Sequence, residues 1–408
     1  MIKNKLFKSF YIFTILILFI LFITSCNRGK LYKIYDISYE LSDDGSYYIA
    51  CGFKNRGDTL AIDEEYNGLP VKEIKEKAFR RCPCSQVIIP DTIEYIGYGA
   101  FEGCIRIRSM FLPFVGAKRY DTFSYGQETL GYLFGNDIYN KTKQTTYNEN
   151  GELVTNEYSI PSSLNYIEVR GDSYIPYHAF QNMTNLAYLN IYDCVSSDNI
   201  LEGCSNLYIL KINSNTINDV LSLFGESEFE NSYKVKDYYI PNTLDTICIN
   251  GDLNDNYING LDSLKYIEIN NALNISYSSI NSLSKIEEIK IKSNIDLVIT
   301  SMSFSNESIK KIELYGNYYL EEKSFYNCKS LIDFDVYGNL NNIGIEAFGL
   351  CKELSSFCVS GNIGMIESKS FDGCEDLKRI FVGGFVNGKA SDCLENCSAY
   401  LDIRGGKY

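Results

Sequence analysis

A repeating unit constrains the fold of this chain more than any other feature of its sequence. The pattern Leu-x-x-Ile-x-Ile-x-Gly recurs with a period of 20 to 23 residues wherever no longer segment intervenes. Self-similarity at a fixed period of this length is typical of solenoids, in which each coil contacts only its neighbours. Copies begin at Ile107 (weakly), Leu164, Leu186, Leu207, Leu244, Leu264, Ile286, Ile309, Leu331, Leu354, Leu377 and, truncated, Tyr400.

Each unit is expected to form one short strand. In Ile-x-Ile the two aliphatic side chains point to one face of a strand, and the residues around them point to the other face. A single strand cannot bury its apolar face alone, so the copies are expected to stack as a parallel sheet. The glycine after the strand permits a tight reversal that a Cβ would hinder. About thirteen coils at ~4.8 Å spacing predict a rod or arc roughly 60 Å long.

A second motif, Ala/Ser-Phe-x-x-Cys, lies between these units and predicts a turn or short helix whose Phe and Cys are buried. Seven of the 14 cysteines occupy its last position or the equivalent slot: 82, 104, 204, 328, 351, 374 and 397. The same slot accepts Met183, which indicates a small apolar core position. Disulfides along this column are conceivable, but its side chains point in parallel, so buried thiols are favoured.

The repeat resembles the BspA-like (treponemal-type) leucine-rich repeats over about residues 38 to 404. The resemblance rests on Leu-x-x-Ile-x-Ile, on the Ala-Phe-x-x-Cys turn and on Ile-Pro strand ends at Pro90, Pro161 and Pro241. Residues 39–48 and 66–71 also resemble that family's N-terminal entry. The resemblance implies a right-handed solenoid, cell-surface display, and adhesion or protein binding, with no catalytic residues to carry over.

The first 25 residues are expected to be a signal peptide. Three lysines precede an apolar run from Phe10 to Ile23, which is shorter than the ~20 residues of a spanning helix. The run ends at Ile23-Thr24-Ser25-Cys26, which resembles the lipobox of bacterial lipoproteins. That resemblance implies cleavage before Cys26 and acylation of its thiol, which would hold the protein at the outer side of a bacterial membrane. An uncleaved anchor with a chance cysteine is the alternative.

Charge and motifs exclude several functions. Removing the signal's three lysines leaves 38 − 3 = 35 cations against 52 anions, a charge of −17, so nucleic acid is not expected as a partner. No motif supports catalysis or a cofactor, and the single histidine, His178, is expected at the surface. Cys82-Pro-Cys84 and Cys393-x-x-x-Cys397 are weak candidates for metal ligands, and no metal site is predicted. A carboxylate pair of the glycosidase kind is not excluded by sequence.

The predicted organisation is a signal peptide (1–25), a tether (26–34), an N-terminal cap (35–70) and a leucine-rich-repeat solenoid (71–408). Two segments, about 113–160 and 214–241, interrupt the repeat. Both contain Leu-Phe-Gly, then a Tyr/Asn-rich stretch, then Ile-Pro, so they are interpreted as two copies of one insert on the same side of the solenoid. Their role, functional or merely mobile, stays open.

The outward residues of the strands are the candidate ligand surface, because the inward positions and the turns are committed to the core. One column aligns Glu268, Lys290 and Glu313, whose charges are expected to pair across strands. The tyrosines are left as the unpaired groups of this face, and they supply contact area at low entropic cost, although tyrosine also has a high β-propensity. The candidate ligand-binding residues are Tyr166, Tyr188, Tyr192, Tyr266, Tyr315 and Tyr337.

The sequence therefore predicts a non-enzymatic, lipid-anchored surface protein that binds a protein or a glycan. Two alternatives belong to other classes. One is a substrate-capturing or hydrolytic lipoprotein, and the other is a passive surface-coat protein without a specific ligand.

Overall fold

A computed structural model describes residues 34–405, except residues 56, 120–125, 140, 171–173, 192–193, 214–218, 254–256, 276–277 and 305. The expected signal peptide, Cys26 and Tyr192 lie outside the described residues. None of the described helices has the length and apolarity needed to cross a membrane.

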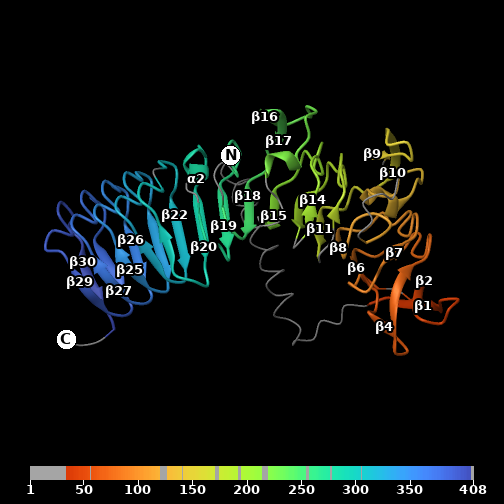
Figure 1. Cartoon of the computed structure of the whole chain (residues 1–408), viewed down its shortest axis with the longest axis horizontal. Helices are drawn as coiled ribbons and strands as arrows, with labels where there is room; N and C mark the ends of the chain where they lie inside the picture. Colours follow the sequence, from red (N-terminus) through yellow and green to blue (C-terminus); the bar gives the residue numbers. More distant parts are fainter. Residues whose placement is uncertain are drawn as a thin grey trace.

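One long parallel sheet runs through the molecule, with one strand from each coil (Figure 1). Its fourteen strands confirm the predicted solenoid, and two of them precede the first unit recognised in the sequence. The strands, in sheet order, are β3 (Thr59–Ala61), β6 (Gln86–Ile88), β8 (Ser109–Leu112), β11 (Tyr166–Val169), β13 (Tyr188–Ile191), β15 (Ile209–Asn213), β18 (Thr246–Asn250), β19 (Tyr266–Asn270), β20 (Glu288–Lys292), β22 (Lys311–Tyr315), β24 (Asp333–Tyr337), β26 (Ser356–Val359), β28 (Arg379–Val382) and β30 (Tyr400–Ile403).

A second parallel sheet covers the other side of the C-terminal coils. Its strands are β21 (Leu297–Ile299), β23 (Tyr318–Leu320), β25 (Leu340–Ile343), β27 (Ile363–Ile366) and β29 (Val386–Lys389). The chain passes from the main sheet to this one through stacked glycines, and Gly338 has a φ of +157°. A Cβ on Gly338 would lie 1.9 Å from the carbonyl oxygen of Gly316. The reversal after the strand therefore requires glycine because the backbones of successive coils approach closely there.

The core is a continuous column between the two sheets and the connecting turns. The aliphatic residues of the repeat are buried, and the turn phenylalanines stack on one another. Phe325 lies between Phe304 and Phe348, with ring centroids at 4.9 and 5.1 Å. Each turn also bonds to the next: the amide of Phe348 donates to the carbonyl of Ser370 at 2.8 Å. These turns contain almost no helix. The only described α-helix is α2 (Ser278–Asn281).

An antiparallel hairpin, β1 (Asp36–Leu41) and β2 (Tyr48–Lys54), lies at the N-terminal end of the solenoid. Strand β2 pairs in parallel with β5 (Leu69–Ile74), which also pairs with β4 (Glu65–Tyr66) and β7 (Tyr95–Ile96). Short strands β12 (Tyr174–Ile175) and β14 (Val195–Ser196) form a separate pair in the central coils.

Each expected insert contains a 3-10 helix followed by an antiparallel hairpin. The first has η2 (Leu130–Phe134) and the hairpin of β9 (Lys141–Tyr147) and β10 (Leu153–Ser159). The second has η3 (Leu221–Leu223) and the hairpin of β16 (Ser232–Val235) and β17 (Tyr238–Pro241). The η elements take the place of the Phe turn in their coils: the amides of Phe101 and Leu201 donate to Leu133 and Leu223. Only the hairpins project, both from the upper side of Figure 1.

Candidate functional site

The outward face of the main sheet is formed by the residues that alternate with the buried aliphatics. On β22, Ile312 and Leu314 are fully buried, whereas Lys311, Glu313 and Tyr315 are half-buried on the opposite face. Because the strands are parallel and in register, equivalent residues align in columns across the sheet. A ligand on this face would therefore contact several coils at once.

The first tyrosine pair is part of a longer aromatic row. The rings of Tyr166 and Tyr188 stack with centroids 4.4 Å apart and planes at 12°. Phe111 lies 5.5 Å from Tyr166 on one side, and the Lys211 ammonium lies 5.6 Å from the Tyr188 ring on the other. The row spans β8, β11, β13 and β15. Sequence reasoning missed Phe111 and Lys211, although the repeat places both at the central outward position of their units.

The second tyrosine pair lies beside a cluster of charges. Tyr315 and Tyr337 stack with centroids 4.4 Å apart and planes at 17°, and the Lys290 ammonium lies 4.8 Å from the Tyr315 ring. Tyr337 is 49% exposed, so this pair is open to solvent at its outer end. The Tyr315 ring therefore contacts the Lys290 ammonium and the stacked Tyr337 ring, and these two contacts hold it in one orientation.

The predicted alignment of opposite charges is confirmed, but Glu268 forms its ion pair with Lys292 rather than with Lys290. Glu268, Lys290 and Glu313 are direct cross-strand neighbours. Lys290 lies 3.7 Å from Glu313, which also pairs with Lys311 at 2.5 Å. Burial opposes ionisation, yet the hydrogen bond and charge of Lys311 hold the pKa of Glu313 below its ordinary value. Pairs of this exposure contribute about 0–1 kcal/mol each, so they maintain register more than they stabilise the fold.

The tyrosines are not the unpaired groups that the sequence suggested. The hydroxyls of Tyr166, Tyr266 and Tyr315 each donate to a glutamate on their own strand, at 2.7, 3.3 and 3.4 Å. That expectation is wrong because a glutamate stands two residues away on the same strand face. Burial raises the pKa of Tyr166 and of Tyr188, so both phenols are neutral at pH 7. The ring faces and edges remain for contact, and the hydroxyls set the orientation.

The candidate tyrosines do not form a single site. The two stacked pairs are separated by four strands of the sheet, β15, β18, β19 and β20. Five strand spacings between β13 and β22 correspond to about 24 Å. Tyr266 lies between the pairs, with Thr246 and Glu288 rather than tyrosines as its cross-strand neighbours. A small ligand could therefore occupy one pair, and only a macromolecule could span both.

His178 is buried, and its predicted surface location is wrong. It is 5% exposed, its Nε2 lies 2.9 Å from Glu202 Oε2, and the Tyr177 ring centroid lies 3.8 Å from its own. Gln181 also donates to Glu202, at 2.7 Å. Hydrogen bonds from His178, Ser227 and Gln181 lower the pKa of Glu202 to about 2, although burial opposes this. Nδ1 of His178 has no hydrogen-bond partner among the described residues. We assign this cluster a structural role, since Gln181 bonds both to Glu202 and to Gln144 and Thr145 of the first hairpin.

The cysteine slot is a hydrogen-bonding position as well as an apolar one. All thirteen cysteines from Cys51 to Cys397 are free thiols in the structure, and six of the seven in the slot are buried. Each slot thiol at 104, 204, 328, 351 and 374 donates to the carbonyl of the phenylalanine in the preceding coil, at 2.6 to 3.2 Å. Burial raises the pKa of Cys204 to about 12, so it is protonated and unreactive. No group of three or more potential ligands is arranged to hold a metal ion among the described residues.

The parallel sheet, the turn ladder and the outward aromatic face together define a leucine-rich-repeat solenoid. The chain matches the model of the BspA type leucine rich repeat region in four overlapping stretches, residues 72–171, 152–253, 251–332 and 298–403. The protein therefore belongs to the BspA-type leucine-rich repeat family, as the sequence resemblance predicted.

Several solved structures are similar to this chain. A leucine-rich repeat protein from Bacteroides ovatus is 17% identical, with 90% of this chain and 98% of that chain covered and a TM-score of 0.23. A leucine rich cell surface protein from Faecalibacterium prausnitzii is 12% identical, with 93% and 95% covered and a TM-score of 0.22. The leucine rich repeat protein of T. pallidum is 15% identical, with 84% and 87% covered and a TM-score of 0.18. No curated protein matches the chain significantly.

Proposed function

We propose that this protein is an exported lipoprotein that binds a protein or a glycan at the bacterial cell surface, without catalysing a reaction. The outward sheet face carries the proposal, in particular the row of Phe111, Tyr166, Tyr188 and Lys211. Large, rigid aromatic side chains give contact area at a low cost in conformational entropy, and they dominate the energy of many interfaces. Family membership and the surface location of a similar protein agree with this proposal.

Binding is tested by separating the two tyrosine pairs. The purified protein is screened for retention on matrix proteins, mucins and bacterial glycans, and the variants are compared on any ligand found. Removing both rings of the contacted pair, Tyr166→Ala with Tyr188→Ala or Tyr315→Ala with Tyr337→Ala, is expected to reduce affinity about thirtyfold, roughly 2 kcal/mol. Tyr319→Ala with Phe385→Ala, at exposed positions outside the main sheet and outside the two inserts, is the matched control. Full binding by both folded double variants would move the site to the hairpins.

Lipid attachment is tested at Cys26. The Cys26→Ala variant is expected to incorporate no radiolabelled acyl chain and to keep its first 25 residues, because the thiol is the acceptor in the proposed processing. Normal cleavage of this variant would show that the segment is an ordinary signal peptide. A parent protein that keeps its first 25 residues would show that the segment is an uncleaved anchor.

Two other functions lead to different outcomes. A hydrolytic or substrate-capturing lipoprotein would turn over a glycan or peptide, which the purified protein is not expected to do. A passive coat protein would bind nothing in the screen, and its surface tyrosines could be replaced without effect on any retention assay.

A further inference from the structure

The two ends of the solenoid differ in what covers the core. At the N-terminal end, Ile34 bridges Thr59 on β3, and the amide of Tyr35 donates to the Thr59 carbonyl at 3.1 Å. The outer edge of the first strand of the main sheet is therefore occupied, and Leu60 on this strand is fully buried. Strand β30 lies at the opposite end of the molecule, the blue end of Figure 1. No strand among the described residues pairs with its outer edge.

The core is open at the end formed by β30. Four apolar residues of the last coil are half-buried, although the same positions are fully buried one coil earlier, as Ile380 and Val382 show on β28. These four residues are Leu394, Cys397, Leu401 and Ile403. Tyr400, on the outward face of β30, is 60% exposed. A solenoid normally ends in a coil with a polar outer face, so an apolar end of this kind indicates a surface that a partner covers.

Both sheets present a free strand edge at this end. Strands β30 and β29 are the last strands of their sheets, and the backbone bonds of β30 run back to the preceding coil. The amide of Arg404, for example, donates to the carbonyl of Val382 at 2.8 Å. An exposed edge of this kind is a template for a further strand. The partner must therefore add to two sheets at once and cover the apolar layer between them, as the end of another solenoid would do.

The sequence of β30 is complementary to itself in one antiparallel register. A pairing centred on this strand, with the buried faces of both copies on the same side, has its two-fold axis at Leu401, Asp402 or Ile403. An axis at Asp402 sets two carboxylates directly opposite each other, which is destabilising. An axis at Leu401 pairs no opposite charges. An axis at Ile403 sets Asp402 of each copy opposite Arg404 of the other, and the Arg404 side chain is 64% exposed and can reach across.

We propose that a second copy of this chain covers this end, with β30 of the two copies paired antiparallel about Ile403. The axis is perpendicular to the main sheet, so it also turns β29, at the edge of the second sheet, toward its own copy. Such an isologous contact closes on itself and forms a dimer rather than a filament. Leu401 and Ile403 of one copy then continue the core of the other, and Asp402 and Arg404 form two ion pairs across the axis.

The orientation of the two copies gives this contact a function. Because the N-terminal hairpin and β30 lie at opposite ends of the solenoid (Figure 1), the N-terminal ends of the two copies point in opposite directions. Fourteen strands at about 4.8 Å make each solenoid roughly 60 Å long. This step rests on the proposed function: with a lipid anchor at Cys26, the two anchors of a dimer lie at its opposite ends and in different membranes. The protein then holds two bacterial cells together by binding its own copy.

The interface is tested by reversing charges in the full-length protein, extracted in detergent, and measuring its mass by sedimentation equilibrium. The parent is expected to form a dimer. Asp402→Arg alone and Arg404→Glu alone each set like charges opposite each other, so each should weaken association at least about tenfold. An equimolar mixture of the two variants should recover the association, because every charge then faces its opposite, and recovery also shows that both variants are folded. Lys54→Glu, a charge reversal at an exposed position of the N-terminal hairpin, is the control.

Bridging is tested with phosphatidylcholine vesicles that carry the protein through its anchor. Vesicles with the parent protein should aggregate, and vesicles with either variant alone should not, as followed by light scattering. A mixture of the two variant populations should aggregate again. A parent that stays monomeric, association unchanged in both variants, or no recovery in their mixture would overturn the interface.

The anchor and the interface fail in different ways. A protein that does not stay on the vesicles would contradict the lipid anchor, while the sedimentation result would still decide the interface. A dimer in detergent whose vesicles do not aggregate would place both copies on one membrane, and it would overturn the bridging of cells.

Discussion

The C-terminal and the central coils follow one repeat but are held together differently. From residue 309 onward the period is 22 to 23 residues, and the turn phenylalanines form one stack. Each coil from Ile309 to the one that begins at Leu377 adds a strand to both sheets. In the central coils, Ile200-Leu201 and η2 replace the Ala-Phe turn, and hairpins leave the solenoid after Gly135 and Gly225.

Polar contacts hold the central irregularity in place. Gln144 Nε2 donates to the Gln181 carbonyl at 3.0 Å, and the Thr145 amide donates to Gln181 Oε1 at 2.7 Å, so the first hairpin is bonded to the next turn. The same Gln181 donates to Glu202, which also pairs with His178. In a regular coil the backbone N–H and C=O groups form hydrogen bonds with the backbone of the neighbouring coils. In an irregular coil some of these groups need side chains as hydrogen-bond partners. The comparison predicts that the free energy of unfolding falls most when buried apolar residues are replaced in the C-terminal coils. In the central coils, replacing the polar residues that bond the irregular segments should have the larger effect.

The largest effect is expected from Phe348→Ala. Phe348 stacks on Phe325 and Phe371 at 5.1 and 5.3 Å and meets Phe334 edge to face at 4.7 Å. Truncation should lower the free energy of unfolding by about 3–5 kcal/mol, measured by urea titration with circular dichroism. Phe180→Ala, equally buried in the centre, is the comparison, and it should cost about 1 kcal/mol less because Phe180 has no ring partner among the described residues. Equal costs would remove the distinction between the two regions.

The next effect concerns the stacked glycines, which connect the main sheet to the second sheet in the C-terminal coils. Gly338→Ala should lower the free energy of unfolding by about 3 kcal/mol, because the new Cβ would overlap the Gly316 carbonyl and force the coils apart. Gly151→Ala at the tip of the first hairpin also has a positive φ, but no atom lies within 4 Å of the added methyl. Its cost should be limited to backbone strain of roughly 1 kcal/mol. Thermal unfolding of both variants checks the difference, and a tolerated alanine at 338 would show that the coils can move apart.

The regular part of this fold could be predicted from the sequence, for a physical reason. A period of 22 to 23 residues with paired aliphatics leaves one arrangement that buries them, so the sheet, its register and the column Glu268–Lys290–Glu313 follow. The glycines of the C-terminal units follow as well, because they stand at one place after the strand, at 316, 338, 361 and 384. Ring stacking of Tyr166 with Tyr188 follows from register alone.

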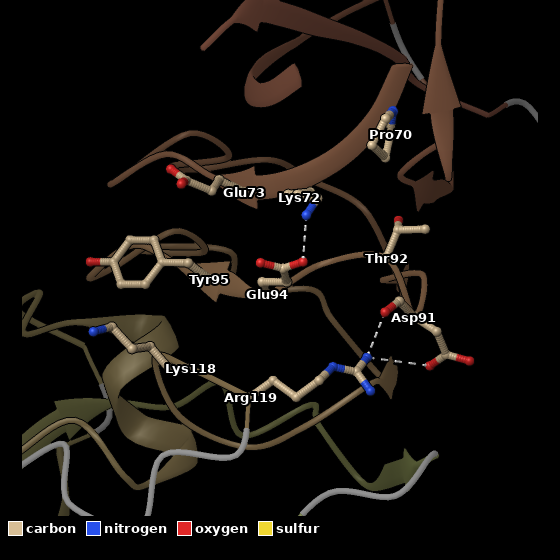
Figure 2. A pocket seen from close by; sticks show the side chains of 9 residues that line it. All are labelled: Pro70, Lys72, Glu73, Asp91, Thr92, Glu94, Tyr95, Lys118 and Arg119. Atoms are coloured by element: carbon tan, nitrogen blue, oxygen red, sulfur yellow. Dashed lines mark hydrogen bonds and ion pairs between the residues drawn. The ribbon is translucent and has the colours of Figure 1, made fainter. Parts of the chain in front are cut away.

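What could not be predicted depends on contacts between segments that the repeat does not relate. His178 is buried because Glu202, one coil further on, and the Tyr177 ring enclose it, and no pattern around His178 indicates either contact. The thiol bonds to phenylalanine carbonyls arise from a backbone geometry that a spacing does not specify. The pocket lined by Thr92 and Arg119 on the N-terminal coils (Figure 2) combines residues from three coils, and apart from Pro70 none of them belongs to a segment that the sequence singled out.

A pH-dependent effect is expected from Glu202→Gln. The pKa of Glu202 is lowered from 4.5 to about 2 in the folded protein, first by the hydrogen bond from His178. Its stabilisation is therefore complete above about pH 4.5, the unfolded value, and is lost as the pH falls toward 2. The variant should be about 1.5–3 kcal/mol less stable than the parent at pH 6, with the difference shrinking below pH 4.

The control for this prediction is Glu307→Gln, which removes an exposed ion pair with Lys329 at 2.5 Å. It should change the free energy of unfolding by less than about 1 kcal/mol at pH 6. A difference between Glu202→Gln and the parent that stays constant from pH 6 to pH 2 would show that the carboxylate charge contributes nothing.

The smallest expected effect is a difference in how fast buried thiols become accessible. Cys204 and Cys351 occupy the same slot, both are fully buried, and each donates to a phenylalanine carbonyl, so alkylation of either requires the coil to open. Cys204 lies beside the irregular coils, whereas Cys351 lies within the phenylalanine stack, so iodoacetamide should label Cys204 several-fold faster in the native protein. In urea without reductant both should label completely, together with the other free thiols. Thiols that stay unlabelled there would be disulfides after all, and faster labelling of Cys351 would mean that the C-terminal stack is the weaker half of the solenoid.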